Sequence, residues 1–210
     1  MAALRETIKI IGEGPTEFFY FNSLKDEFPQ LQNIEPKVPK HSSIEELRKN
    51  IETAIEEGNA KVFCVIDMDN KREAAEKEKY KQLRSDFSKP VIDDKKGIRC
   101  EVVFYETDRC TEFFFLLYFK YTTSEFATSD KVEEELHKIC GYEKKIEFFK
   151  KHPLHPFFIK QNGSLKTAIN NANNTCKTRE SDSRDYSYSE LGKMMKDIGP
   201  DSEKWKRPIR

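Results

Sequence analysis

The sequence predicts an α/β fold in which a mostly parallel sheet is flanked by helices and followed by a helical C-terminal extension. Through residues 1–125, short apolar runs typical of buried strands alternate with helical patterns. This alternation indicates β-α-β units, which place successive strands in parallel. Residues 126–210 show helical patterns with no convincing strand between them. We therefore expect a core over residues 1–125 and a helical extension over residues 126–210 packed on it.

The first part of the core is predicted as strand, helix, strand and helix. Residues 7–11 are a short apolar strand, and residues 15–27 form a helix that begins at a proline, which suits the first helical turn. A short strand is expected near residues 36–39. Residues 44–55 carry isoleucine and leucine at helical spacing, which predicts a helix with one apolar face.

The second part of the core is built around residues 62–66, which read VFCVI and form a buried strand. The charged segment 71–87 has few apolar positions and is predicted as a solvated helix. Residues 98–105 form a third strand, and residues 113–119 a helix that is apolar nearly all round and hence deeply buried. Further helices are predicted over residues 129–140, 143–151, 163–177 and 189–198.

Charge and cysteine content narrow the classes of function. Because 37 basic residues balance 37 acidic ones, the net charge provides no global attraction to nucleic acid or membrane surfaces. The five cysteines are irregularly spaced with no C-x-x-C pair, which favours reduced thiols and a cytoplasmic location. The N-terminus lacks the apolar region of a signal peptide, and the longest apolar stretch, 113–119, is too short to span a bilayer. We expect no membrane association.

Asp67 and Asp69 follow the central strand directly and form the first candidate site. In an open α/β sheet, ligands bind beyond the carboxyl ends of the strands. Two like charges this close repel each other, and a hard cation such as Mg²⁺ relieves that repulsion by taking oxygen ligands from both. Aspartate is also common in turns, so this D-x-D alone leaves both a metal site and an ordinary polar turn open.

Three glutamates follow the other two strands in the same way. Glu13 and Glu17 come after the first strand, and Glu112 after the third. If the strands are parallel, all five carboxylates reach one edge of the sheet. Oxygen ligands without histidine or cysteine favour Mg²⁺ or Mn²⁺, which catalyse phosphoryl chemistry. Glu17 and Glu112 could also be favourable charges at helix N-termini, whereas Glu13 lies between two glycines and gains nothing obvious there.

Two further motifs are set aside. Residues 152–155, HPLH, contain close histidines, but the prolines argue against a helix, and we interpret the segment as a loop without a metal-binding role. The sequence contains no G-x-x-x-x-G-K-[ST], which excludes an autonomous P-loop ATPase. Any nucleotide-driven step would come from a partner.

Three blocks of the sequence resemble the RloB-like family, whose members resemble TOPRIM-fold nucleases of anti-phage defence loci. Residues 10–21, IIGEGPTEFFYF, are similar to the family's E-G-x-x-T-E-x-x-Y-F signature, and residues 62–69, VFCVIDMD, to the strand and D-x-D of TOPRIM domains. Residues 107–119, TDRCTEFFFLLYF, are similar to the family's S-N-P-x-F-E-x-W-x-L-L-H-F segment. Residues 141–145 and 165–172 resemble weaker C-terminal blocks.

The third block departs from the family pattern in its turn and helix. Thr107 stands for serine, Asp108 and Arg109 stand for asparagine and proline, Phe114 stands for tryptophan, and Tyr118 stands for histidine. These departures concern the strand-to-helix turn, while every expected carboxylate is present.

The resemblance implies a role for each carboxylate. Glu13 would match the TOPRIM glutamate as a metal ligand or general base, and Asp67 and Asp69 would be the D-x-D ligands of Mg²⁺ or Mn²⁺. Glu17 and Glu112 would be supporting ligands, as in related nucleases that resemble two-metal enzymes. Those nucleases also use a lysine, for which Lys144 and Lys166 are the candidates here.

We expect a metal-dependent nuclease that cleaves phosphodiester bonds of DNA or RNA, the effector of a defence system controlled by a partner ATPase. One alternative is a haloacid-dehalogenase-type phosphatase with Asp67 as nucleophile. The residues after Asp69, Asn and Lys instead of Gly and Thr, argue against it. Another alternative is a non-catalytic sensor or effector module held by an ATPase. The sequence leaves open the choice of DNA or RNA, the number of metal ions, and whether the chain forms a homodimer.

Overall fold

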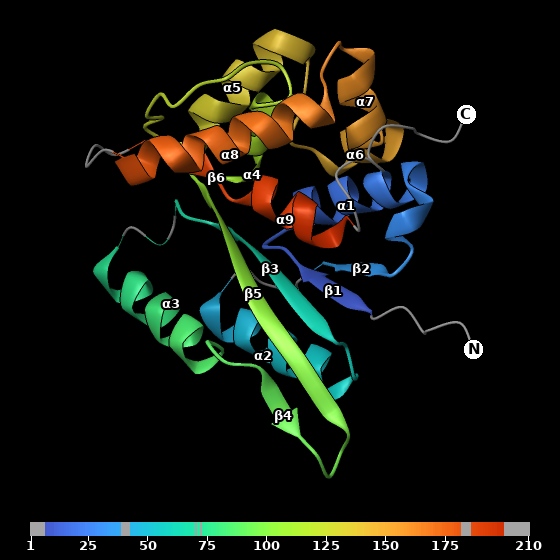
Figure 1. Cartoon of the computed structure of the whole chain (residues 1–210). Coiled ribbons are helices and arrows are strands. Elements are labelled where there is room, and N and C mark those ends of the chain that lie inside the picture. The colour runs from blue at the N-terminus through green and yellow to red at the C-terminus, as the bar shows by residue number, and fades with distance from the viewer. Residues whose placement is uncertain (1–6, 39–42, 70, 72, 182–185, 200–210) are drawn as a thin grey trace.

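The computed structural model describes residues 7–38, 43–69, 71, 73–181 and 186–199, and a six-stranded sheet forms the centre of this described part (Figure 1). Four strands pair in parallel in the order β2-β1-β3-β5, and β4 and β6 each pair antiparallel with β5. The predicted α/β class is confirmed. The strands are β1 (Ile8–Ile11), β2 (Ile34–Lys37), β3 (Lys61–Asp67), β4 (Val91–Asp93), β5 (Ile98–Asp108) and β6 (Tyr188–Ser189).

Helices cover both faces of the sheet (Figure 1). The helices α2 and α3 lie on one face, and α1, α4 and the helices of the C-terminal part lie on the other. The helical segments are α1 (Pro15–Glu27), η1 (Pro29–Leu31), α2 (Ile44–Glu56), α3 (Ala74–Asp86), α4 (Thr111–Leu116), α5 (Ser129–Cys140), α6 (Ile146–Lys151), α7 (Leu154–Lys160), α8 (Leu165–Ser181) and α9 (Leu191–Ile198).

The alternation of side chains along β3 divides the interior into two hydrophobic cores. Val62, Cys64 and Ile66 face the smaller core beneath α2 and α3. Phe63 and Val65 face the larger core, which contains residues of α1 and α4 together with residues of α5 to α9. Since successive residues of a strand point to opposite faces, five consecutive apolar residues are what a strand covered on both sides requires.

The predicted elements of the core are present with small shifts. The strand expected near residues 36–39 is β2, two residues earlier, and Pro39 lies outside the described residues. The helix expected over residues 113–119 begins earlier, as α4, and is fully buried. Helices α5 to α9 pack against the same core as α1 and α4. The proposed division after residue 125 stays a prediction.

Three expectations about the chain after residue 86 were wrong. The third strand continues through residue 108 rather than ending at 105, and the short antiparallel strand β4 precedes it. The C-terminal part contributes a strand, β6, to the sheet. The segment 152–155 is a loop only in its first two residues, because α7 begins at Leu154 with Pro153 as its N-cap. Pro156 lies in the first turn of α7, where a proline interrupts no backbone hydrogen bond of the helix.

His155 is buried in α7 and has a structural role. Its Nδ1 lies 3.0 Å from the Tyr118 hydroxyl, which lies 2.8 Å from the Tyr20 hydroxyl, and its backbone N–H donates to Ser23 Oγ. Burial lowers the pKa of His155 to about 4. The imidazole is therefore neutral at pH 7, and His155 links α7 to α1 and to Tyr118, just after α4, through hydrogen bonds.

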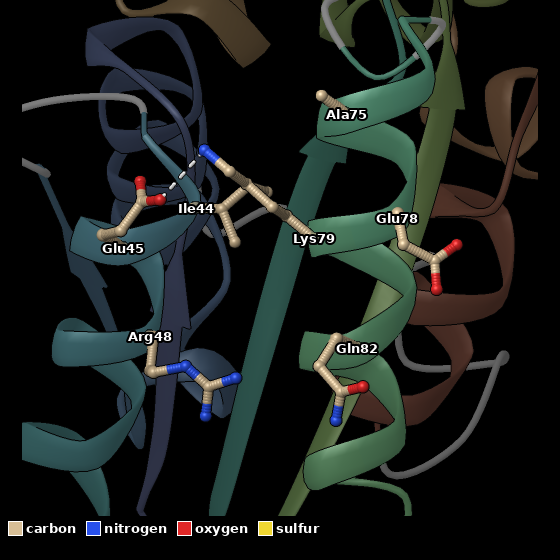
Figure 2. A pocket seen from close by; sticks show the side chains of 7 residues that line it. All are labelled: Ile44, Glu45, Arg48, Ala75, Glu78, Lys79 and Gln82. Carbon is tan, nitrogen blue, oxygen red and sulfur yellow. Dashed lines mark ion pairs between the residues drawn. The ribbon is translucent and has the colours of Figure 1, made fainter.

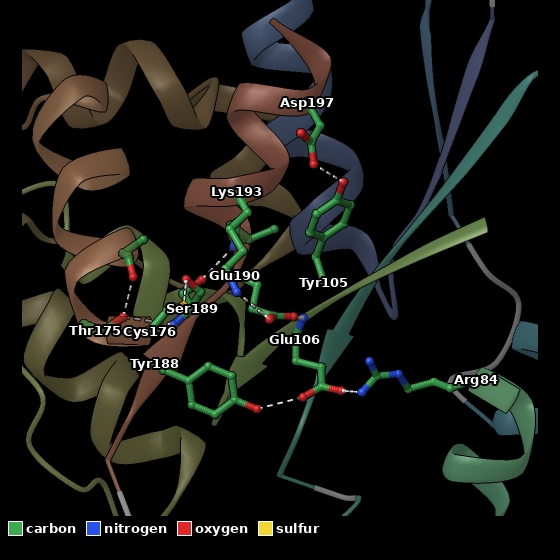
Figure 3. A network of polar contacts seen from close by, with 12 residues as sticks. Arg84, Tyr105, Glu106, Thr175, Cys176, Tyr188, Ser189, Glu190, Lys193 and Asp197 are labelled. Carbon is green, nitrogen blue, oxygen red and sulfur yellow. Dashed lines mark hydrogen bonds and ion pairs between the residues drawn. The ribbon is translucent and has the colours of Figure 1, made fainter. Parts of the chain in front are cut away.

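A buried carboxylate on β5, Glu106, connects three parts of the fold (Figure 3). Its Oε1 accepts hydrogen bonds from the Tyr80 hydroxyl, at 3.0 Å, and from Arg84 of α3, at 2.5 Å. Its Oε2 accepts a hydrogen bond of 2.8 Å from the hydroxyl of Tyr188 in β6. One side chain thus holds α3 and β6 to the same strand, although they lie far apart in the sequence.

Replacing this carboxylate tests whether the network stabilises the fold. Glu106→Ala leaves the buried hydroxyls of Tyr80 and Tyr188 without their acceptor, so we expect the free energy of unfolding to fall by about 2–4 kcal/mol. Urea denaturation followed by circular dichroism measures this loss. Glu101→Ala, at an exposed position on the same strand, is the control and should change stability by less than about 0.5 kcal/mol. Equal effects of the two substitutions would contradict this role of Glu106.

Candidate functional site

The five carboxylates predicted from the sequence come from segments that end at one edge of the sheet. Glu13 follows β1, Asp67 is the last residue of β3, and Asp69 lies just beyond it. Glu17 and Glu112 lie in the first turns of α1 and α4, which follow β1 and β5. Since β1, β3 and β5 are adjacent and parallel, the carboxyl ends of all three strands meet at this edge.

Gly12 allows Glu17 to approach the end of β1. A Cβ atom at Gly12 would lie 2.4 Å from Glu17 Cβ, which is far closer than two such atoms can come. Glu17 is buried and its Oε2 accepts a hydrogen bond of 2.9 Å from the Gly14 backbone N–H. A carboxylate at this position satisfies a free N–H group of the helix and interacts favourably with the helix dipole. The capping interpretation of Glu17 is therefore correct, whether or not Glu17 has a further role.

Asp67 joins β3 to the start of α4. Its Oδ1 accepts hydrogen bonds from the Thr111 backbone N–H, at 2.9 Å, and from the Thr111 hydroxyl, at 3.0 Å. These two donors fix the orientation of the carboxyl group, and neither of them contacts Oδ2. The strand end is thus tied to the helix that bears Glu112.

Glu112 is fully buried within the cluster. Its Oε1 accepts hydrogen bonds from the hydroxyls of Thr16, at 3.2 Å, and Tyr142, at 3.0 Å, and lies 3.2 Å from Lys144 Nζ. Its Oε2 is buried and has no hydrogen-bond partner among the described residues. A buried carboxylate oxygen without a donor is costly, and such a group calls for an explanation.

Glu13 is paired with a lysine that we expected on a solvated helix. Lys71 is buried, with only 4% of its side chain exposed, and its Nζ lies 2.5 Å from Glu13 Oε1. The same Nζ donates a hydrogen bond of 3.0 Å to the backbone oxygen of Asp67. The prediction that the segment from residue 71 is solvated was therefore wrong for Lys71, because it folds back onto the acidic cluster instead of entering α3.

Asp69 reaches the C-terminal part of the chain. Its Oδ2 accepts a hydrogen bond of 2.7 Å from the hydroxyl of Ser129, the first residue of α5, and its backbone N–H donates to the Arg109 backbone oxygen. The Tyr142 and Lys144 contacts with Glu112 also come from beyond residue 125. The extension therefore completes the surroundings of the cluster.

Burial and neighbouring charges raise the pKa values of Glu17, Asp67 and Glu13. Burial raises the pKa of Glu17 to about 7, and the nearby charge of Glu112 acts in the same direction. Burial also raises the pKa of Asp67 well above its usual range, with contributions from Glu17, Glu13 and Glu112. For Glu13, burial and the charge of Asp69 raise the pKa, while the ammonium of Lys71 opposes this shift. All five acids thus belong to one electrostatic cluster.

The donor set suits a hard cation, but its present arrangement does not. Besides its lysines, the cluster consists mainly of carboxylate and hydroxyl oxygens, with the buried thiol of Cys110 beside Glu112 and Asp67, and Glu112 Oε2 has no hydrogen-bond partner in the described part of the chain. Oxygen donors of this kind are the ligands of Mg²⁺ and Mn²⁺. However, no group of three or more His, Cys, Asp or Glu side chains among the described residues is placed to hold a metal ion.

The two lysines proposed from the resemblance lie in different surroundings. Lys144 bridges Glu112 and Glu133 of α5, so it borders the cluster. Lys166 is exposed on α8 and, among the described residues, makes no side-chain hydrogen bond or ion pair with any of the five acids. The structure thus brings Lys144 and Lys71, but not Lys166, to the site. Lys71 stands two positions after Asp69, and only this proximity in the sequence could have indicated its place.

One surface groove lies beside the acidic cluster, and another lies between α2 and α3. The first has a volume of about 680 Å³ and is bordered by Tyr142 and Lys144, the two residues of the C-terminal part that contact Glu112. Its other lining residues carry charges of both signs. The second, about 560 Å³, lies between α2 and α3, where Lys79 of α3 pairs with Glu45 of α2 (Figure 2). None of the five acids lines the second groove.

Comparison with known proteins gives one match. A family model described as RloB-like protein matches residues 8–198, nearly the whole chain. No curated protein and no solved structure matches the chain. In the described residues, no helix is long and apolar enough to cross a membrane, and all five cysteines are buried and free.

The raised pKa of Glu17 predicts how stability depends on pH. Because its pKa rises from 4.5 to about 7 on folding, the folded protein binds more protons than the unfolded chain between these values. Stability without metal should therefore fall as pH rises from about 4.5 to about 7, by an amount on the order of 1–3 kcal/mol. Glu17→Gln should weaken this dependence. Urea denaturation in chelator at both ends of the range measures it.

The exposed residue Glu52 on α2 supplies a matched control, because Glu52→Gln makes the same chemical change outside the cluster. This variant should keep the pH dependence of the wild-type protein. A Glu17→Gln protein with unchanged pH dependence would show that Glu17 is ionised in the folded state throughout this range.

Proposed function

This chain belongs to the RloB-like family, and we propose that it is a metal-dependent nuclease that cleaves phosphodiester bonds of DNA or RNA. The observation that carries the proposal is the convergence of five carboxylates at the ends of three adjacent parallel strands. A cluster of acids costs free energy, since each charge raises the cost of ionising the next, and such costly clusters are typical of functional sites. The resemblance of the E-G-x-x-T-E and D-x-D segments to TOPRIM-type nucleases supports the same assignment.

Each acid has a distinct part in the proposed reaction. Asp67, held by Thr111, and Asp69 would be the principal ligands of Mg²⁺ or Mn²⁺, with Glu17 and Glu112 as supporting acids. Such an ion, when bound, supplies charge stabilisation at the phosphoryl group and the leaving oxygen. Glu13, whose side chain is only 11% exposed, would accept a proton from the attacking water.

The surroundings of Glu112 would orient the cluster towards its substrate. Tyr142 and Lys144 contact Glu112 from one side and border the open groove on the other. The Lys144 ammonium, 39% exposed, would provide a positive charge where a phosphate arrives at the acids. Because the net charge of the chain is zero, attraction of a phosphate to the site would depend on local charges such as this lysine.

We further propose that the nuclease is a defence effector under the control of a partner ATPase in the cytoplasm. The family resemblance supports the role in defence, and the lack of a P-loop motif in the sequence supports the assignment of any nucleotide-driven step to a partner. Five free, buried cysteines suit a reducing compartment. The present pairing of the acids with lysines and hydroxyls also suits a protein that is inactive until it is triggered.

Asp67→Asn tests the proposed activity. The substitution keeps the shape of the side chain and an oxygen acceptor for Thr111, but it removes the charge that a divalent ion requires. Cleavage of plasmid DNA, single-stranded oligonucleotides and tRNA in Mn²⁺ should fall by about a hundredfold or more, and chelator should abolish cleavage by the wild-type protein.

Asp94→Asn, at an exposed position between β4 and β5, is the control and should cleave at the wild-type rate. Unchanged cleavage by folded Asp67→Asn protein would reject the assignment. A wild-type chain that is inactive alone but active with a co-expressed ATPase would favour the controlled form of the proposal.

Divalent ions should also stabilise the folded chain. At a concentration about tenfold above its dissociation constant, Mg²⁺ or Mn²⁺ should raise the melting temperature by about 3–6 °C. Asp67→Asn should abolish most of this rise and should stabilise the metal-free protein, because it removes one charge from a repelling cluster. Differential scanning fluorimetry measures both effects. A strong loss of metal-free stability in this variant would instead show that the negative charge of Asp67 stabilises the folded chain.

A further inference from the structure

Lys71 brings an ammonium group into the acidic cluster. Its Nζ contacts Glu13 Oε1, at 2.5 Å, and the backbone oxygen of Asp67, at 3.0 Å. Glu13 Oε1 also accepts the backbone N–H of Asp67, at 3.3 Å, so Glu13 is held at the end of β3. The ammonium group thus lies between the loop after β1 and the end of the strand that leads to the D-x-D.

The burial of Lys71 distinguishes it from a surface charge. Only 4% of the lysine side chain and 11% of the Glu13 side chain are exposed, whereas most other lysine pairs of the chain lie at the surface. A buried ammonium is expensive to desolvate and is retained only where partners compensate for its lost hydration. Lys71 has such compensation from one carboxylate and one backbone oxygen.

The Lys71–Glu13 pair helps to explain why acids whose chemistry suits a divalent ion are not arranged to hold one. The acids suit a hard cation, yet no three of them are placed to share one in the described residues. Glu13 directs its Oε1 to Lys71, and Asp69 directs its Oδ2 to Ser129. As long as Lys71 holds Glu13, this carboxylate is engaged by a monovalent cation that belongs to the chain itself.

We propose that Lys71 is a built-in competitor of the divalent ion, an autoinhibitory cation that must leave Glu13 before this residue can act at the metal centre. The inference rests on the proposed function in assuming that Glu13 serves a divalent ion. In the inhibited form, Lys71 neutralises Glu13 and ties it to β3. In the competent form, the divalent ion takes over the neutralisation of the cluster, and the ammonium is released for another anion.

Lys144 provides a matched comparison within the same cluster. It also pairs with a buried acid, Glu112, but it is 39% exposed and is shared with Glu133. Removal of either lysine makes the cluster more negative and therefore more attractive to any cation. Only removal of Lys71 would, in addition, free a carboxylate from an occupied position, so the difference between the two variants isolates the competition.

Mn²⁺ binding to the full chain tests the proposal without measuring activity. Isothermal titration calorimetry, supported by electron paramagnetic resonance of free Mn²⁺, compares the wild-type protein with Lys71→Met, Lys71→Gln and Lys144→Met. If the lysine-paired form dominates, removing the competitor should tighten Mn²⁺ binding by about tenfold or more in both Lys71 variants. Lys144→Met should tighten it by only about twofold to threefold.

Each outcome of the Mn²⁺ titrations either supports or overturns the proposed competition. Tightening confined to Lys71→Met and Lys71→Gln supports the competition, whereas equal tightening in Lys144→Met would reduce it to general electrostatics and overturn it. Unchanged or weaker binding in folded Lys71 variants would also overturn it and would indicate that Lys71 supports the metal centre. The Lys71→Gln variant retains hydrogen bonding to Glu13 if the methionine variant does not fold.

Failure of the inference is distinguishable from failure of the proposed function. If no variant and no wild-type protein binds Mn²⁺, the metal centre itself is rejected, and the inference falls with it. If wild-type protein binds Mn²⁺ and Asp67→Asn does not, the metal centre stands, and the Lys71 variants alone decide on the competition.

Discussion

Repulsion among buried carboxylates at one edge of a parallel sheet is the constraint around which the rest of this structure is arranged. Burial and neighbouring charges both raise the pKa values of Glu17 and Asp67, so each acid must be compensated locally. The compensation comes from short-range partners, namely backbone N–H groups, hydroxyls and two lysines. The absence of a side chain at Gly12 follows from the same constraint, because Glu17 occupies the space that a Cβ atom would need. Features that look independent in the sequence are thus consequences of one electrostatic problem.

The C-terminal part of the chain also compensates the acids by hydrogen bonding to them. Ser129 contacts Asp69, and Tyr142 contacts Glu112, so helices that follow the core close over the acids. In addition, β6 pairs with the end of β5, where Tyr188 meets Glu106. A core that ended at residue 125 would leave Glu112 with one hydroxyl donor instead of two and without its ammonium partner. The extension is therefore part of the site's architecture and not only a cover over an apolar surface.

The sequence was sufficient for features that repeat or that depend on local chemistry. The apolar run 62–66 predicted a strand buried on both faces, and the spacing of residues 44–55 predicted α2, because each pattern determines which faces are buried. The convergence of the five acids followed from parallel topology alone. By contrast, β6 is two residues long, and its position depends on contacts with β5 more than 80 residues away. Lys71 was missed for a related reason, since a lysine in a charged segment has no local signal that distinguishes a buried ion pair from a solvated surface.

A lysine within an acidic cluster changes what a divalent ion must do in order to bind. In an empty cluster, the ion competes only with its own hydration shell and with protons on the acids. In the proposed competition, the ion would also have to displace a buried ammonium that contacts Glu13 and the backbone oxygen of Asp67, so its apparent affinity would be reduced by the fraction of molecules in which Lys71 holds Glu13. A phosphate near the cluster would offer that ammonium another anion, and by linkage it would then strengthen binding of the divalent ion. Substrate and ion would thus assist each other, and a chain without substrate would remain in its lysine-paired form even where magnesium is plentiful.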